Sequence, residues 1–174
     1  MDELAPGTEV LLRSGVSPLD VERVPSGARL EFVAVADGFA PRRGVIPAGA
    51  TWETATGKPR YDLAIQLERS RARAGSIDPW PPTEPGSLIG GVGPAGTVHI
   101  LTSPRGAEVW MLAGQAPQAK IDGLACGGSV ELLLAGASDG QPFRRRLRVD
   151  PSQFTRDLTG TPTARVSARL AGTE

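Results

Sequence analysis

The chain has 174 residues, of which 19 are basic and 19 acidic, so its formal net charge is zero. Such a balance gives no long-range field toward nucleic acid or an anionic membrane, and we expect neither as a partner. No apolar run approaches the roughly 18 residues of a membrane span, and the first ten residues lack the pattern of a signal peptide. We therefore expect no direct membrane insertion by this segment.

Turn residues divide the chain into short apolar runs. It contains 22 glycines and 16 prolines, a composition typical of short strands joined by many turns. In chain order, the runs that predict strands lie at 7–12, 30–36, 62–68, 97–102, 130–136 and 143–149. Residues 62–68 alternate apolar and polar side chains with the period of a half-buried strand. We predict an all-β fold.

The same series of residues occurs twice. "GTEV" at 7–10 matches "GAEV" at 106–109, and 19–35 matches 119–135 with Glu31 on Glu131. Further along, 37–45 matches 139–147, and 61–67 matches 164–170. An ordered series of matches with few gaps indicates one module written twice.

The repeat sets the predicted domains. Residues 1–68 form the first module, 69–96 a Pro/Gly-rich linker, and 97–174 the second module. We expect two small antiparallel β-sandwiches, each of prealbumin- or immunoglobulin-like type, and proteolysis near "RSRARAG" should then release two folded halves. The second copy opens with a strand at 97–102. Either the first copy lacks this strand, or the sequence begins just inside the corresponding strand of the first copy.

This difference predicts an open sheet edge. If Thr97–Thr102 pairs into the sheet of copy two, copy one has too few residues to supply the same row of backbone groups. The edge around Thr8–Leu12 should then be covered by linker residues or by a strand from another molecule.

The chain resembles tandem PEGA domains. The resemblance is carried by "SPRGAEVW" (103–110), a Pro-x-Gly-Ala turn followed by x-Val-aromatic, and by the later "IDGLACGGSVELLL" (121–134). The first copy departs from it, with Thr8 in place of Ala and Leu11 in place of the aromatic residue. The resemblance implies β-sandwich modules of bacterial envelope proteins or serine/threonine kinase tails. It implies a surface or interaction role and no catalytic residues.

A glycine-rich motif near residue 93 has the spacing of a cofactor-binding loop, but we interpret it as part of the linker. Gly91-x-Gly93-x-x-Gly96 has the spacing of a dinucleotide-binding loop, which needs a strand before it and a helix after it. Here a Pro-rich stretch precedes it and a strand is predicted to follow. We expect no cofactor.

Single histidine and cysteine residues do not make a site. His99 and Cys126 are the residue types of a catalytic cysteine–histidine pair, but nothing in the sequence brings the two together. Two such residues cannot supply the three or four ligands of a zinc site. We expect His99 to face solvent on a strand, and Cys126 to be structural. Its solitary occurrence excludes an intrachain disulfide.

The strand "FRRRLRV" (143–149) is the best candidate for a partner-binding surface. Strand alternation places Arg144, Arg146 and Arg148 on one face, and guanidinium groups suit phosphate, sulfate or an acidic partner. The alternative is a solvated sheet face paired with acidic residues on neighbouring strands. Copy one has only Arg42 and Arg43 at this place.

The tryptophans give a second candidate. Trp52 matches Phe154 and is expected in the core, and Trp110 is expected to be half-buried. Trp80, in "DPWPPTEP", has no repeat counterpart, so it docks the linker onto a module or binds a partner.

Together these features favour a non-enzymatic interaction, adhesion or scaffolding module of a bacterial envelope or kinase-associated protein. The alternative is a carbohydrate-binding accessory domain of an envelope enzyme. The repeat-equivalent Glu9 and Glu108 lie in different modules, which argues against a paired acid and base. We expect the periplasmic or extracellular side of the envelope if the segment belongs to a longer protein, and the cytoplasm if Met1 is the native start.

Overall fold

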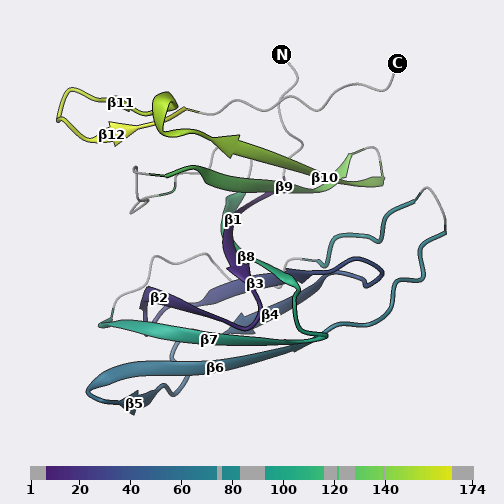
Figure 1. The fold of residues 1–174 in the computed structure, drawn as a ribbon, viewed down its shortest axis with the longest axis horizontal. Coiled ribbons are helices and arrows are strands. Elements are labelled where there is room, and N and C mark those ends of the chain that lie inside the picture. Colours follow the sequence, from purple (N-terminus) through teal and green to yellow (C-terminus); the bar gives the residue numbers. More distant parts are fainter. Residues whose placement is uncertain are drawn as a thin grey trace. The chain divides into compact units, whose positions relative to one another are not determined.

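The computed structural model describes residues 7–73, 76–82, 93–115, 121, 128–138 and 140–165, and their regular structure is almost entirely β (Figure 1). The elements are β1 (Glu9–Val16), β2 (Leu19–Pro25), β3 (Leu30–Val35), β4 (Arg42–Ile46), β5 (Glu53–Ala55), β6 (Lys58–Gln66), β7 (Ala95–Ser103), β8 (Glu108–Gln115), β9 (Val130–Ser138), β10 (Gln141–Val149), the 3-10 turn η1 (Pro151–Gln153), β11 (Thr155–Arg156) and β12 (Pro162–Thr163). The all-β, sandwich-like prediction is confirmed.

The chain forms two compact units. A central unit comprises Ser14–Leu112, and a terminal unit comprises Met1–Arg13 together with Ala113–Glu174. These bounds differ from the predicted modules at 1–68 and 97–174. The difference arises because β1 and β8 each begin in one unit and end in the other.

The central unit is a β-sandwich of two sheets. One contains β1, β8, β3 and β4 in that order, and the other has the order β2-β7-β6-β5. Strand alternation explains the core, because Phe32 and Ala34 of β3 point inward together with Ile46 of β4. They pack in one cluster with buried residues of the other sheet, among them Val98 and Ile100 of β7. These five side chains are all fully buried.

Strand β7 does not pair as the repeat suggested. The segment Thr97–Thr102 was expected in the sheet of copy two, but it lies between β2 and β6, both from copy one. Its pairing with β2 is antiparallel and its pairing with β6 is parallel. The inward residues Val98 and Ile100 are apolar and fit the central core, which explains why the segment is inserted there.

The terminal unit contains the strand order β10-β9-β1 and the hairpin β11-β12. Strand β1 pairs with β9, β10 with β9 and β11 with β12, and each pairing is antiparallel. Its short hairpin is the repeat counterpart of β5-β6, since Thr54 lies opposite Pro59 and Arg156 lies opposite Pro162. The two hairpins thus lie at equivalent positions of the two predicted copies.

The two copies exchange their first common strand. Strand β1 of copy one pairs with β9 of copy two, and β8 of copy two pairs with β3 of copy one. The registers are equivalent, since Glu9 lies opposite Ala135 and Glu108 lies opposite Val35. A repeated sequence presents the same side chains in the same register, so either acceptor strand can take either donor strand.

This exchange corrects the expectation of an open edge at Thr8–Leu12. Residues Glu9–Leu12 pair with β9, and Thr8 is only 2% exposed. The strand that covers this edge therefore comes from the second copy of the same chain, and not from the linker or from another molecule.

The predicted linker is partly integrated into the central unit. Arg69 forms a β-bridge with Phe39, the amide of Ser70 donates to the carbonyl of Gly38 at 2.9 Å, and Ala95 already begins β7. Between these points, Ser76–Pro82 forms neither helix nor strand. The linker is thus anchored at both ends.

Candidate functional site

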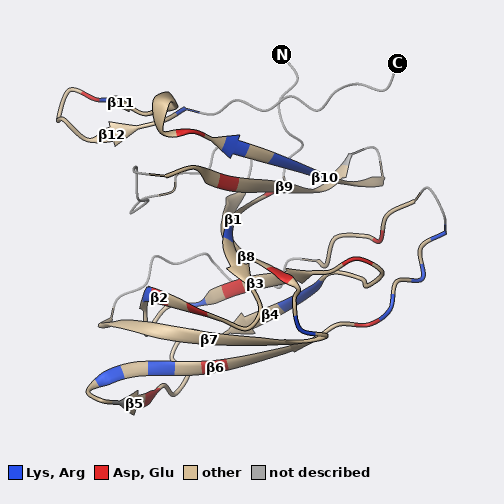
Figure 2. Ribbon diagram, viewed as in Figure 1, with Lys and Arg blue, Asp and Glu red and all other residues tan. Residues whose placement is uncertain are grey.

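Strand β10 carries the densest group of basic residues that the sequence analysis singled out. It pairs with β9 along its whole length, from Gln141 opposite Ser138 to Val149 opposite Val130 (Figure 2). We call its four arginines, Arg144, Arg145, Arg146 and Arg148, the arginine surface. All of them belong to the terminal unit.

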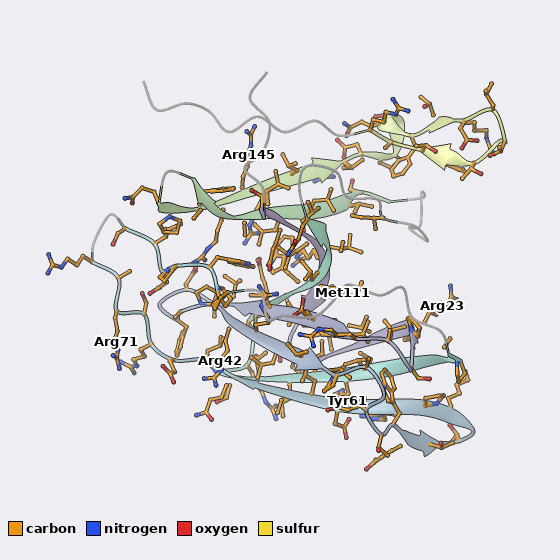
Figure 3. The ribbon with its side chains drawn as sticks, turned by 180° about the vertical axis from the view of Figure 1, so that it is seen from behind. Arg23, Arg42, Tyr61, Arg71, Met111 and Arg145 are labelled. Carbon is orange, nitrogen blue, oxygen red and sulfur yellow. The ribbon has the colours of Figure 1, made fainter. Side chains whose placement is uncertain are left out.

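The register agrees with the predicted alternation. Arg144, Arg146 and Arg148 lie opposite every second residue of β9, namely Ala135, Leu133 and Glu131. Arg146 and Arg148 are exposed, whereas Arg144 is half-buried. Sequence reasoning missed the contribution of Arg145, which is also exposed and projects from the strand (Figure 3). Strand alternation places Arg145 on the same face as the apolar residues Phe143, Leu147 and Val149, so the sequence offered no reason to expect it at the surface.

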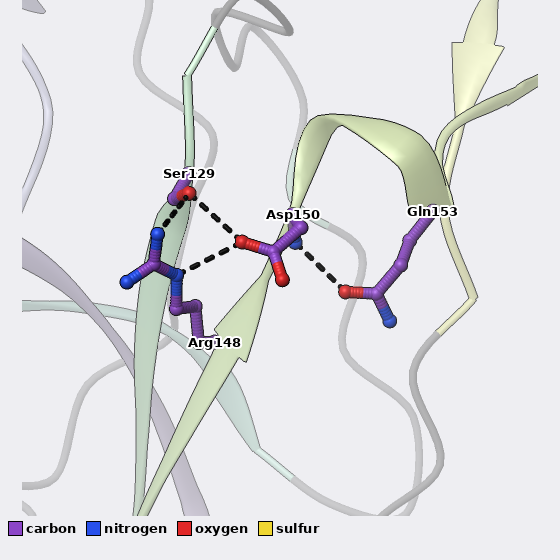
Figure 4. Close-up of polar contacts among 4 residues, drawn as sticks. All are labelled: Ser129, Arg148, Asp150 and Gln153. Atoms are coloured by element: carbon purple, nitrogen blue, oxygen red, sulfur yellow. Dashed lines mark hydrogen bonds and ion pairs between the residues drawn. The ribbon is translucent and has the colours of Figure 1, made fainter.

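Arg148 is held by a local network (Figure 4). Its Nε donates to Oδ1 of Asp150 at 2.9 Å, and its Nη2 donates to Oγ of Ser129 at 2.9 Å. Ser129 in turn donates to the same Asp150 oxygen, and the amide of Asp150 donates to Oε1 of Gln153 at 2.7 Å. The acidic partner of Arg148 lies just beyond the same strand, and not on a neighbouring strand as the alternative interpretation expected. Arg145 and Arg146 are the other two exposed arginines of the strand.

A further acidic residue lies beside this network. Glu131 is opposite Arg148 in the register, and its carboxylate also forms a 3.2 Å ion pair with Nε of Arg13 from β1. The Glu131 side chain is 40% exposed, so water screens this pair and it contributes little to stability. The negative charge of Glu131 nevertheless offsets part of the positive charge on the strand face that carries Arg148.

The pKa of Asp150 is lowered from its ordinary value of 3.8, first by the hydrogen bond from Arg148 and then by that from Ser129. A lowered pKa in the folded state means that the ionised carboxylate stabilises the fold above the unfolded-state pKa. That contribution is lost as the pH falls through the folded-state value. We therefore expect Asp150 to titrate below 3.8 in an NMR carboxyl titration, and its midpoint to rise in Arg148→Ala. An unchanged midpoint in the variant would contradict this cause.

His99 pairs with an aspartate of the neighbouring strand β2. It faces outward between the buried Val98 and Ile100, as expected, and its Nδ1 lies 2.6 Å from Oδ1 of Asp20. Both side chains are partly exposed, at 32% and 50%. In the described part of the chain, no three His, Cys, Asp or Glu side chains come together as a possible metal site. Cys126 lies outside the described residues.

Glu9, Glu108 and the described part of the glycine-rich motif, none of which was expected to form a site, lie in regular strands or beside one. Glu9 is in the terminal unit and Glu108 is in the central unit, so the two carboxylates are placed by different strand pairs. In the glycine-rich motif, Gly96 lies within β7 and no helix begins there, while Gly91 lies outside the described residues. The linker interpretation therefore fits the described part of this motif.

The tryptophans differ in burial. Trp110 is 1% exposed, so the expectation of a half-buried side chain was wrong. Trp52 is half-buried and packs against the central core, with its ring 5.6 Å from that of Tyr61. Trp80 is half-buried and has an interaction partner, which is consistent with the linker-docking alternative.

No helix among the described residues has the length and apolar character needed to cross a bilayer. No protein-family model, curated protein or solved structure matches the chain, so the arrangement of its own residues is the basis for a functional conclusion.

Proposed function

We propose that the chain is a non-enzymatic protein-interaction module, of the PEGA-like kind that the sequence suggests, whose arginine surface binds an acidic segment of a partner protein. The observation that carries this proposal is the exposure of Arg145 and Arg146 on one strand of the terminal unit. Two adjacent guanidinium groups point to opposite faces of a strand, so together they can hold carboxylates from both sides.

The chemistry of the surface favours a protein over a neutral glycan. A neutral sugar has no anionic group with which these guanidinium groups could form charge-assisted hydrogen bonds, whereas an acidic peptide has several. A bacterial envelope or kinase-associated parent protein, with the module on the periplasmic or extracellular side, is the setting that we propose for this interaction. Because the formal net charge is zero, attraction of an acidic segment depends on local groups of basic residues and not on a net field of the chain.

The proposal is tested with the charge-reversal variant Arg145→Glu/Arg146→Glu and a fluorescent peptide of twelve alternating Glu and Gly residues. We expect the native chain to bind the peptide, with an affinity that falls as salt is raised, and the variant to lose at least about tenfold in affinity. Fluorescence anisotropy measures both. Arg42→Glu/Arg60→Glu is the matched control, since it reverses two partly exposed arginines of the central unit.

Two results would overturn the proposal. Equal binding by the native chain and the β10 variant would remove the arginine surface from the interaction. Salt-independent binding of neutral oligosaccharides, in the absence of peptide binding, would instead favour the carbohydrate-binding alternative.

A further inference from the structure

In the central unit, an arginine on strand β4 binds an extended segment of the same chain. This residue, Arg43, is the repeat counterpart of an arginine on β10. Its side chain is 5% exposed, and its Nη2 donates to the carbonyl oxygen of Pro81 at 2.9 Å. The two bonded residues are 38 positions apart in the sequence. It therefore attaches the Ser76–Pro82 segment to the sheet.

The bound segment has a defined chemistry. Ser76–Pro82 reads "SIDPWPP", with three prolines that favour an extended conformation. Asp78, Trp80 and Pro81 are half-buried, whereas Ile77, Pro79 and Pro82 are exposed. Asp78 also accepts a short hydrogen bond from Oγ of Ser70. One side of the segment thus faces the protein, where its Pro81 carbonyl binds Arg43 and its Asp78 carboxylate binds Ser70.

Strand pairing identifies the equivalent position in copy two. Val33 lies opposite Arg43 on β4, and its repeat counterpart Leu133 lies opposite Arg146 on β10. The pairing shifts the sequence alignment by one residue, since the sequence had matched Arg43 with Arg145. Arg146, and not Arg145, is therefore the counterpart of the segment-binding arginine.

The two positions differ in how far they are covered. In copy one, both Arg43 and the adjacent Glu31 are nearly inaccessible, at 5% and 2% side-chain exposure. In copy two, Arg146 is exposed and the side chain of Glu131 is 40% exposed. The same strand geometry thus presents an arginine that is covered in one copy and accessible in the other.

We infer that the face of β10 around Arg146 binds an extended, proline-containing acidic segment of a partner protein, in the manner in which Arg43 binds Ser76–Pro82. This inference rests on the proposed function and specifies the ligand class. The Arg146 guanidinium donates to a backbone carbonyl next to proline, and an Asp of the segment is attracted by Arg148 on the same face of the strand. A proline-rich segment loses little conformational entropy on binding, which favours it over a flexible chain.

The test uses the full chain and a labelled peptide with the sequence Ser-Ile-Asp-Pro-Trp-Pro-Pro. We expect Arg146→Ala to weaken binding at least about tenfold, the loss typical of a charge-assisted hydrogen bond. Arg42→Ala, an exposed arginine of the repeat-equivalent strand, is expected to leave the affinity unchanged. Amide chemical-shift changes should centre on Gln141–Val149.

A peptide of the same composition with its residues reordered separates this inference from simple charge attraction. The ordered peptide should bind at least several-fold more tightly than the reordered one. If both bind equally, the inference fails, while the alternating Glu/Gly peptide still decides the proposed function independently. Shift changes around Arg43 instead of β10 would show replacement of the chain's own segment, and would also overturn the inference.

Discussion

The two sequence copies, produced separately as residues 1–82 and 93–174, are expected not to fold. The first fragment lacks β7 and β8, which supply the fully buried Val98, Ile100 and Val109 to the central core. Burial of one such side chain contributes about 1.5–3 kcal/mol. Loss of all three, with the backbone pairings of two strands, therefore removes an amount comparable with the whole stability of a domain, about 5–15 kcal/mol.

The second fragment has the reciprocal defect. It lacks β1, so the β9 residues that pair with Glu9–Leu12 would lose one hydrogen-bonded neighbour. It also contains β8 without its partner β3, and β7 without its partners β2 and β6. Neither fragment contains the strand with which its exchanged strand pairs in the full chain, and each exposes buried apolar side chains to water.

Circular dichroism and proton–nitrogen correlation spectra of each fragment provide the measurement. We expect narrow amide dispersion from either fragment alone, and native dispersion when the two are refolded together. As a control, a protease site placed after Gly86 of the full chain should give a cleaved protein that stays associated in size-exclusion chromatography. A well-dispersed spectrum from 1–82 alone would contradict the strand exchange as the basis of folding.

Glu31→Gln is expected to be strongly destabilising, by about 2–4 kcal/mol. The Glu31 carboxylate is 2% exposed, with Arg29 Nη2 at 3.2 Å and Arg43 Nη1 at 3.8 Å. Neutralising it leaves the buried Arg43 without this counter-charge. Removing one partner of a buried ion pair is costly because the remaining charge has already lost its hydration.

The repeat provides a matched control in Glu131→Gln. Glu131 occupies the same register position in copy two and forms an ion pair of the same length, 3.2 Å, with Arg13. Its side chain is 40% exposed, so we expect a loss below about 1 kcal/mol. Urea unfolding curves at neutral pH compare the two variants. Equal losses would show that burial does not distinguish the two glutamates.

The arginine surface illustrates how far alternation can predict a site. The period of a strand correctly placed Arg144, Arg146 and Arg148 opposite every second residue of β9. It could not predict that Ser129 and Asp150 would bind Arg148, since Ser129 is distant in sequence and Asp150 lies just beyond the strand. An acidic residue two positions after an arginine was the available signal.

The sequence by itself determined the β class, the repeated module and the outward orientation of His99. These properties follow from turn residues and from the two-residue period of a strand, which act locally. Only the tertiary structure decided that β1 pairs with β9 and β8 with β3. A repeat gives both donors and both acceptors the same register, so local pattern cannot choose between pairing within a copy and pairing between copies. Burial of Arg43 but not of Arg146 depends likewise on a segment distant in sequence, whose Pro81 carbonyl is brought to the sheet only by folding.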